Sequence, residues 1–182
     1  MSRAAHERDM AELVRGAESL LTQLGLGPTF TLTDLHRRVE RHRGRPVHVI
    51  ARPLPAPAPH GLWIASEQAD YIFYDGGAGP VRQHQIIGHE LGHVLVDDGA
   101  APARLDELTA MLLPEVDPAV PARLRLRSAY DDVTERRAEV FGSVVVLRID
   151  SWSAPPGVGP VDPAVLARLA ASLESADPEA GR

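Results

Sequence analysis

Hydrophobic side chains recur at helical spacing over residues 5–25, in the first part of the chain. Positions three and four residues apart share one helix face, so the pattern predicts an amphipathic helix that ends near Gly25. A second helix is expected from Thr31 to Gly44, because Asp34 follows Thr31 at the spacing of a capping pair. The apolar positions that define the first helix are Met10, Leu13, Val14, Ala17, Leu20, Leu21 and Leu24.

The next part of the chain changes to a composition typical of strands. Residues 46–51 predict one strand, and residues 61–66 and 70–74 predict a hairpin, because both segments are rich in aromatic and β-branched side chains. The alternating prolines of residues 53–59 indicate a stiff, extended loop before the hairpin. We therefore expect a short β-sheet in the middle of the chain.

Helical patterns return after this sheet. Residues 80–96 predict a helix whose first turn suits Pro80. A further helix is expected to begin near Ser128 or Asp131 and to extend to about Arg148. Its β-branched residues Val144, Val145 and Val146 leave a strand at its end as an alternative.

The order of these elements predicts a mainly helical α+β fold, with the short sheet packed on the helix that follows it. We divide the chain into an N-terminal helix at residues 1–28, a central domain at 29–150, and a C-terminal part at 151–182. The C-terminal part is expected to contain a linker, a helix at 162–175 and a flexible tail. A short helix is also expected at 105–113.

Composition narrows the classes of function. The chain of 182 residues has 19 basic and 25 acidic residues and a net charge of −6, which argues against nucleic-acid binding by the whole domain. It contains no cysteine, which excludes disulfide scaffolds and thiol catalysis. We see neither a signal peptide nor a membrane span, so we expect a cytoplasmic location. The arginines of residues 37–45 are expected to form a solvated helix face, with a patch for phosphate or an acidic partner as the alternative.

The strongest chemical signal is the segment Gly88-His-Glu-Leu-Gly-His93 within the predicted helix. Residues four positions apart in an α-helix lie one turn apart on nearly the same face, so His89 and His93 can direct both imidazoles at one metal ion. Glu90 can reach a water molecule beside that metal without binding the metal itself. Gly92 indicates close packing by another backbone, since a glycine inside a helix costs about 1 kcal/mol relative to alanine.

A catalytic zinc site needs a third protein ligand, and Glu135 is the best candidate. Glu139 lies four residues later on the same helix face and is expected to orient a ligand histidine. An exchange of these two roles stays open, as does pairing of Glu135 with a nearby arginine. Ala138 and Gly142 are small, as expected for a helix packed closely against Gly92.

On these residues the chain resembles the ImmA/IrrE family of zinc metallopeptidases, over roughly residues 30–150. The resemblance is carried by the strand and hairpin, by the His-Glu-x-x-His segment, and by the pattern Glu135-x-x-Ala138-x-x-Phe141. It implies a small zincin-like α+β domain with Zn²⁺ as cofactor. It also implies a protein partner, because known members cleave, or are proposed to cleave, helix-turn-helix repressors, and relatives are often regulators or toxin–antitoxin components.

The resemblance assigns roles to individual residues of this chain. His89, His93 and Glu135 would be the metal ligands, and Glu90 would be the general base. We therefore predict a zinc-dependent endopeptidase that cleaves a helix-turn-helix regulator or an antitoxin, with no direct nucleic-acid or membrane partner. One alternative is a zinc-binding regulatory component that binds its partner without proteolysis. Another is a helical interaction domain with a chance motif.

Further residues are weaker candidates. The strand at 70–74 is a candidate to dock the substrate as an added strand. Tyr71, Tyr74 and Tyr130 are candidates to stabilise an oxyanion, with simple packing as the alternative. His84 does not share the face of the two motif histidines, so we expect no metal binding by it.

Overall fold

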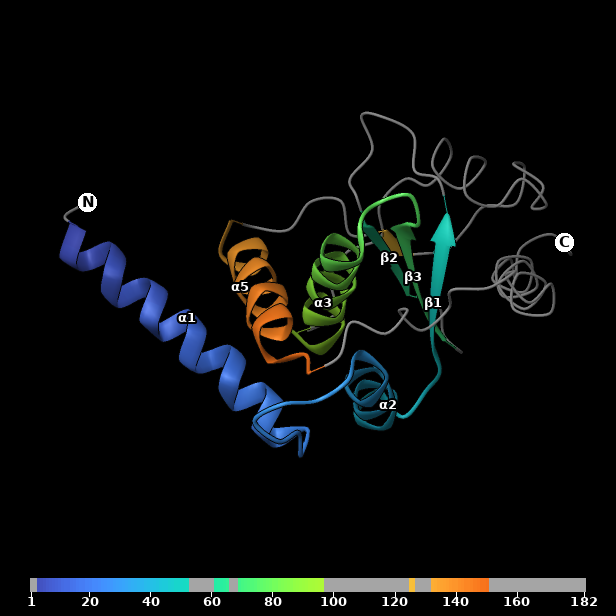
Figure 1. The fold of residues 1–182 in the computed structure, drawn as a ribbon, viewed down its shortest axis with the longest axis horizontal. Coiled ribbons are helices and arrows are strands. Elements are labelled where there is room, and N and C mark those ends of the chain that lie inside the picture. Colours follow the sequence, from blue (N-terminus) through green and yellow to red (C-terminus); the bar gives the residue numbers. More distant parts are fainter. Residues whose placement is uncertain (1–2, 53–60, 66–68, 97–124, 127–131, 151–182) are drawn as a thin grey trace, which may run out of the picture.

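The fold is α+β and mostly helical in the part of the chain that the structure describes (Figure 1). The predicted helix at 105–113, the C-terminal part at 151–182 and Tyr130 lie outside the described residues. The computed structural model describes residues 3–52, 61–65, 69–96, 125–126 and 132–150.

Helices α1 and α2 form where the hydrophobic pattern predicts them. Helix α1 spans Arg3–Gln23, and α2 spans Leu32–Arg43. The Thr31 hydroxyl accepts a hydrogen bond from the Asp34 backbone N–H, and the Asp34 carboxylate accepts one from the Thr31 N–H, so the predicted capping pair is confirmed. Gly44 ends α2 in the left-handed conformation, with a φ of 67°, which glycine adopts without a steric penalty.

The sheet is mixed, and its strand order is β1-β3-β2-β4. Strand β1 (Val47–Arg52) pairs in parallel with β3 (Asp70–Asp75). Strand β2 (Gly61–Ala65) pairs antiparallel with β3, so the predicted hairpin pairing is confirmed. The short strand β4 (Arg125–Leu126), which the sequence analysis does not predict, pairs with the end of β2.

Strand β3 lies in the interior of the sheet, which corrects one sequence-based expectation. Its residues pair with β1 on one side and with β2 on the other, so both of its edges are occupied. A substrate cannot add to residues 70–74 as a further strand, and the prediction of a docking strand there is wrong. The error arises because strand order depends on long-range pairing, which the alternation of side chains within one segment does not reveal.

Helices α3 (Pro80–Val96) and α5 (Asp132–Arg148) run antiparallel in close contact. A Cβ atom added at Gly142 would lie 2.9 Å from the Gln85 carbonyl oxygen, and one at Gly92 would lie 3.3 Å from the Ala138 Cα atom. The close packing predicted from these small residues is therefore confirmed. Helix α5 continues through Val145, so the alternative of a strand at its end is wrong.

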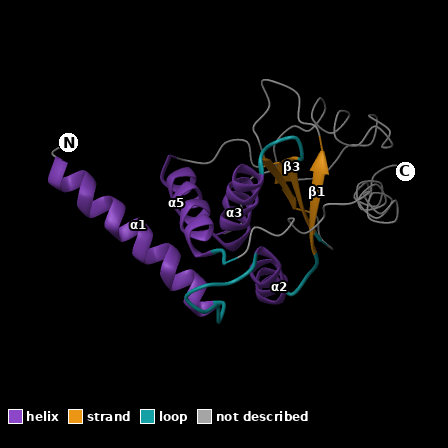
Figure 2. Cartoon of the chain, in the orientation of Figure 1, coloured by secondary structure: helices purple, strands orange, loops and turns teal. Residues whose placement is uncertain are grey.

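The elements are arranged in layers, with α1 against α5, α5 against α3, and α3 against the sheet, while α2 contacts α3 and β1 (Figures 1 and 2). The core between α3 and the sheet contains Trp63, Ile72 and Tyr74 from the strands and Ile87 and Leu91 from the helix. Burial of these large apolar side chains, at about 25 cal/mol per Å², fixes α3 on the sheet. No helix among the described residues is both long and apolar enough to cross a bilayer.

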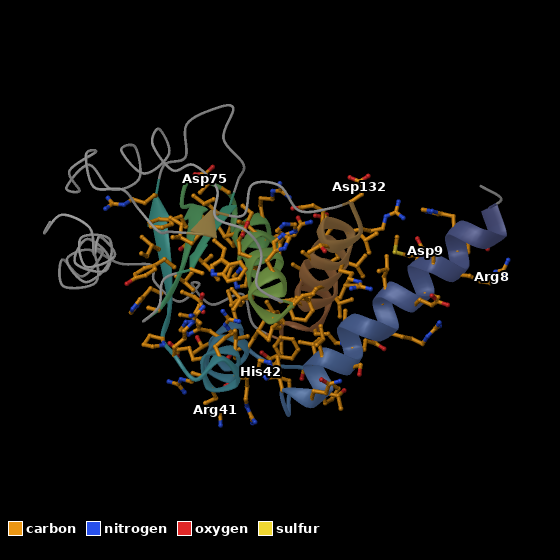
Figure 3. All side chains as sticks on the ribbon, turned by 180° about the vertical axis from the view of Figure 1, so that it is seen from behind. Arg8, Asp9, Arg41, His42, Asp75 and Asp132 are labelled. Atoms are coloured by element: carbon orange, nitrogen blue, oxygen red, sulfur yellow. The ribbon has the colours of Figure 1, made fainter. Side chains whose placement is uncertain are left out.

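A buried carboxylate ties α2 to the sheet. Asp70 is fully buried and accepts hydrogen bonds from Arg45 Nη2 (2.7 Å), Arg43 Nε (3.1 Å) and Trp63 Nε1 (3.0 Å); we call these four residues the Asp70 cluster. The expectation of a solvated arginine face is therefore wrong for Arg43 and Arg45. Arg41 does point outward from α2 (Figure 3).

Candidate metal centre

The contact between α3 and α5 brings the predicted metal ligands together. His89 and His93 lie one turn apart on α3, and Glu135 faces them from the first turn of α5. One ligand atom from each residue lies within 4.8 Å of the other two, so the group could hold a metal ion. The packing of the small residues at the contact is what allows a carboxylate of α5 to approach both rings.

The distances within this group suit a single ion. His89 Nε2 and His93 Nε2 are 3.0 Å apart, and the two Glu135 carboxylate oxygens each lie 3.6 Å from one of these nitrogens. Zinc bonds of about 2.0–2.1 Å in a tetrahedral arrangement place neighbouring ligand atoms about 3.3 Å apart. The donor set therefore fits a divalent ion, although imidazole and carboxylate ligands also suit other transition metals.

Glu139 reaches the opposite side of the His89 ring. Its Oε2 atom lies 3.6 Å from His89 Nδ1, whereas Glu135 lies on the Nε2 side that faces His93. Gln85 Nε2 donates a hydrogen bond of 3.3 Å to Glu139 Oε1. A carboxylate on the far ring nitrogen is the usual means of orienting a ligand histidine. The ligand role of Glu135 and the orienting role of Glu139 stay predictions.

Burial keeps His89 in the form that a metal requires. Desolvation lowers the pKa of His89 below its usual value of 6.5, opposed by the negative charges of Glu135 and Glu139, while Arg82 lowers it further. The ring is therefore mostly neutral at pH 7. A neutral imidazole has a free lone pair, which is the state that binds a metal ion.

Glu90 is a buried acid that no described residue compensates. The residue is 7% exposed, and no described residue donates a hydrogen bond to its carboxylate. Burial raises the pKa of Glu90 from 4.5 to about 8, with a smaller contribution from the negative charge of Glu135. Strand β2 lies directly over this carboxyl group, because a Cβ atom added at Gly61 would lie 2.5 Å from Glu90 Oε1.

A cavity of about 240 Å³ opens beside His89 and Glu90. Four of its described lining residues are not among the site residues predicted from the sequence, namely Gly61, Arg82, Gln85 and Ile86. Arg82 and Gln85 precede His89 by seven and four residues, so helical spacing could have placed them on the same face. Gly61 carries no such signal, because the approach of β2 to α3 is a tertiary contact.

The weaker candidates lie elsewhere. His84 is buried, and its Nδ1 donates to the Pro80 carbonyl oxygen at 2.6 Å, so it is not part of the metal group. Tyr71 and Tyr74 are buried in β3, and neither belongs to the described lining of the cavity. Burial raises the pKa of Tyr74 above its ordinary value. The positions of these two tyrosines therefore favour a packing role in the core over stabilisation of an oxyanion.

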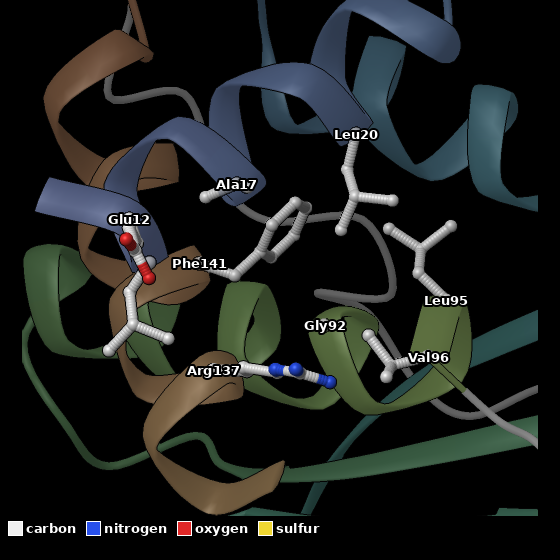
Figure 4. A pocket seen from close by; sticks show the side chains of 10 residues that line it. Glu12, Ala17, Leu20, Gly92, Leu95, Val96, Arg137 and Phe141 are labelled. Carbon is white, nitrogen blue, oxygen red and sulfur yellow. The ribbon is translucent and has the colours of Figure 1, made fainter. Parts of the chain in front are cut away.

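A second cavity, of about 400 Å³, lies between α1, α3 and α5. Figure 4 shows Leu20 of α1, Phe141 of α5 and Leu95 of α3 around it. His89, Glu90, His93 and Glu135 are not among the described residues that line this cavity. It is therefore separate from the candidate metal centre.

Comparison of the chain with protein-family models, with curated proteins and with solved structures finds no match.

Proposed function

We propose that the chain is a zinc-dependent endopeptidase of the ImmA/IrrE type, with a zincin-like fold, that cleaves a helix-turn-helix regulator or an antitoxin. The observation that carries the proposal is the position of Glu90. This buried glutamate, which no described residue neutralises, lies beside three side chains that could hold a metal ion. A purely structural metal site has no need of such a glutamate. A buried acid left without a partner costs stability, so its position indicates a chemical role.

Zinc is the metal that we propose for this donor set, because two histidines at this spacing on one helix are typical zinc ligands. Two imidazoles and one carboxylate leave a fourth position of a tetrahedral site open, as in zinc hydrolases. A zinc ion at this place would activate a water molecule and polarise the carbonyl group of the scissile peptide bond. His89, His93 and Glu135 would hold the ion, while Glu139 would keep the His89 ring in its orientation.

Glu90 would move the proton. Its carboxylate would accept a proton from the attacking water molecule as the new C–O bond forms, and would deliver it to the leaving nitrogen as the peptide C–N bond breaks. A divalent cation beside Glu90 would oppose the effect of burial and favour the ionised carboxylate. The glutamate would then work near neutral pH as an acceptor first and a donor second.

The substrate would bind along β2 and not along β3. Strand β4 pairs with Ile64 and Ala65 of β2, and within the described residues nothing pairs with Gly61, Leu62 and Trp63 on that side. An extended peptide can add to such an edge through main-chain hydrogen bonds. Because Gly61 lies against Glu90, a peptide on this edge would run past the proposed base.

The test uses a helix-turn-helix protein or antitoxin encoded beside this chain as the substrate. We expect discrete fragments with the zinc-loaded protein, and a rate about 10²–10⁴ lower with Glu90→Gln, which removes the base and retains the metal ligands. Glu12→Gln is the matched control, because Glu12 is exposed on α1. If the parent protein and Glu90→Gln both bind the partner and neither cuts it, the peptidase proposal is wrong. The chain would then be a zinc-binding regulatory component.

A further inference from the structure

Arg82 is a cationic side chain among the described residues that line the cavity beside the candidate metal centre. It is exposed in the first turn of α3, and its Nη1 donates a hydrogen bond of 3.0 Å to Gln85 Oε1. No carboxylate among the described residues pairs with it, and its Nε and Nη2 donors make no hydrogen bond to them. The guanidinium group therefore keeps two adjacent donors available, which is the arrangement that binds a carboxylate through two parallel hydrogen bonds.

A row of side chains connects Arg82 to the metal centre. Arg82 contacts Gln85, Gln85 donates to Glu139, and Glu139 lies against His89 Nδ1. Gln85 thus separates the positive guanidinium group from the negative Glu139 carboxylate and contacts both. Because Gln85 is itself held by Glu139, it positions the guanidinium group at the outer end of the cavity.

The length of this row limits where a substrate group could meet Arg82. Arg82 and His89 are seven residues apart, which is about 10 Å along a helix axis. An extended peptide advances about 3.3 Å per residue. A peptide that places its scissile bond at the metal centre would therefore bring a side chain one to three positions away within reach of Arg82.

We propose that Arg82 gives the site a preference for peptides with Asp or Glu one to three positions from the scissile bond. This inference rests on the proposed peptidase function and adds a substrate class to it. The acidic side chain enters the cavity of about 240 Å³ and pairs with the Nε and Nη2 donors. Arg82 is then a specificity residue, because it contacts the substrate away from the reacting atoms.

The test measures the cleavage of a peptide library made by digesting a bacterial proteome, with mass spectrometry of the products. The zinc-loaded protein should cut peptides that are enriched in Asp and Glu at one fixed position within three residues of the cut. Arg82→Glu should reverse this preference to Lys and Arg and lower kcat/KM for an acidic peptide about tenfold or more. Arg82→Lys should retain the preference in weaker form. Arg37→Glu, on the exposed face of α2, is the control and should change neither quantity.

A binding measurement separates this inference from the peptidase proposal. Immobilised Glu90→Gln protein should capture acidic peptides from the same library, and the double variant Glu90→Gln/Arg82→Glu should not. Cuts without an acidic preference, or a preference that Arg82→Glu leaves unchanged, would overturn the inference and leave the peptidase standing. Acidic capture that depends on Arg82, without any cleavage, would support the inference and overturn the peptidase. Absence of both cleavage and acidic capture would overturn both.

Discussion

Two buried carboxyl groups of this molecule have opposite surroundings. Asp70 is fully buried, and two guanidinium groups and an indole N–H donate to it. Glu90 is nearly as buried, and burial, with a smaller contribution from the negative charge of Glu135, raises its pKa to about 8. The first carboxyl group is surrounded by hydrogen-bond donors, whereas the burial of the second and a neighbouring like charge act against its ionisation.

This difference separates a structural acid from a candidate catalytic one. The Asp70 cluster joins the end of α2 to the start of β3, and its donors offset the cost of burying the charge. At Glu90 the described residues leave that cost in place, in a cavity wall next to the group that could hold a metal ion. Burial of an uncompensated acid lowers the stability of the fold. Such a residue is expected where it serves the chemistry of a site and not the stability of the protein.

The largest expected effect is a pH dependence that Glu90 imposes on the metal-free protein. Its pKa is raised from 4.5 to about 8 in the folded state, so the folded protein holds a proton that the unfolded chain releases. Stability should therefore fall as the pH rises from about 4.5 to 8, by at most about 1.4 kcal/mol per pH unit. Glu90→Gln cannot ionise and should lose this part of the decline.

Urea unfolding in the presence of a chelator, at pH 5, 6, 7 and 8, measures this effect. The difference in stability between Glu90→Gln and the parent protein should grow with pH, in favour of the variant. Titrating groups that do not interact with Glu90 affect both proteins alike and cancel in the difference. If the unfolding free energies of the two proteins fall in parallel as the pH rises, Glu90 is compensated in the folded state. The contrast with Asp70 would then disappear.

The sequence predicts features that depend on neighbouring residues, and it does not predict contacts between distant segments. The spacing of His89 and His93 and the capping pair at Thr31 are helix properties, so they can be seen within a few residues. The sequence identifies Asp70 only as the start of a strand, because its arginine partners come from the end of α2 and the segment after it, and its indole partner comes from β2. The central place of β3 was missed for the same reason.

Glu135 is a partial exception to this limit. It lies far from His93 along the chain, but the small residues that follow it and the glycine of the motif helix pointed to a close helix contact. The structure contains that contact and places the Glu135 carboxylate against both rings. The sequence does not single out Arg82 and Gln85, although their spacing from His89 is helical, because polar residues on an exposed helix turn are common without any role.

The second prediction concerns the structural acid. Asp70→Ala removes a buried acceptor that two partly buried guanidinium groups and a buried indole N–H share, and it should destabilise the protein by about 3 kcal/mol. Asp9→Ala removes an exposed carboxylate that pairs with Arg136 and should cost about 1 kcal/mol or less. Denaturant unfolding of the two variants measures the contrast, and equal losses would show that the Asp70 cluster contributes no more than a surface pair.

The third prediction tests the helix contact on which the metal-ligand group depends. Gly142→Ala places a Cβ atom 2.9 Å from the backbone of α3 and should destabilise the protein by about 2 kcal/mol while weakening metal binding. Gly16→Ala on α1 meets no atom within 4 Å and should stabilise the protein by up to about 1 kcal/mol, because alanine favours a helix. Thermal unfolding of both variants gives the comparison, and a neutral Gly142→Ala would mean that α3 and α5 are not closely packed.

The most direct test of the account is the zinc content of the protein and its ligand variants. After incubation with zinc and removal of excess ion, elemental analysis should find about one zinc per chain in the parent protein and in Glu90→Gln. His89→Ala and His93→Ala should retain little or none, and Glu135→Gln should bind more weakly. A parent protein without zinc, or histidine variants that retain it in full, would contradict the metal centre and the function proposed from it.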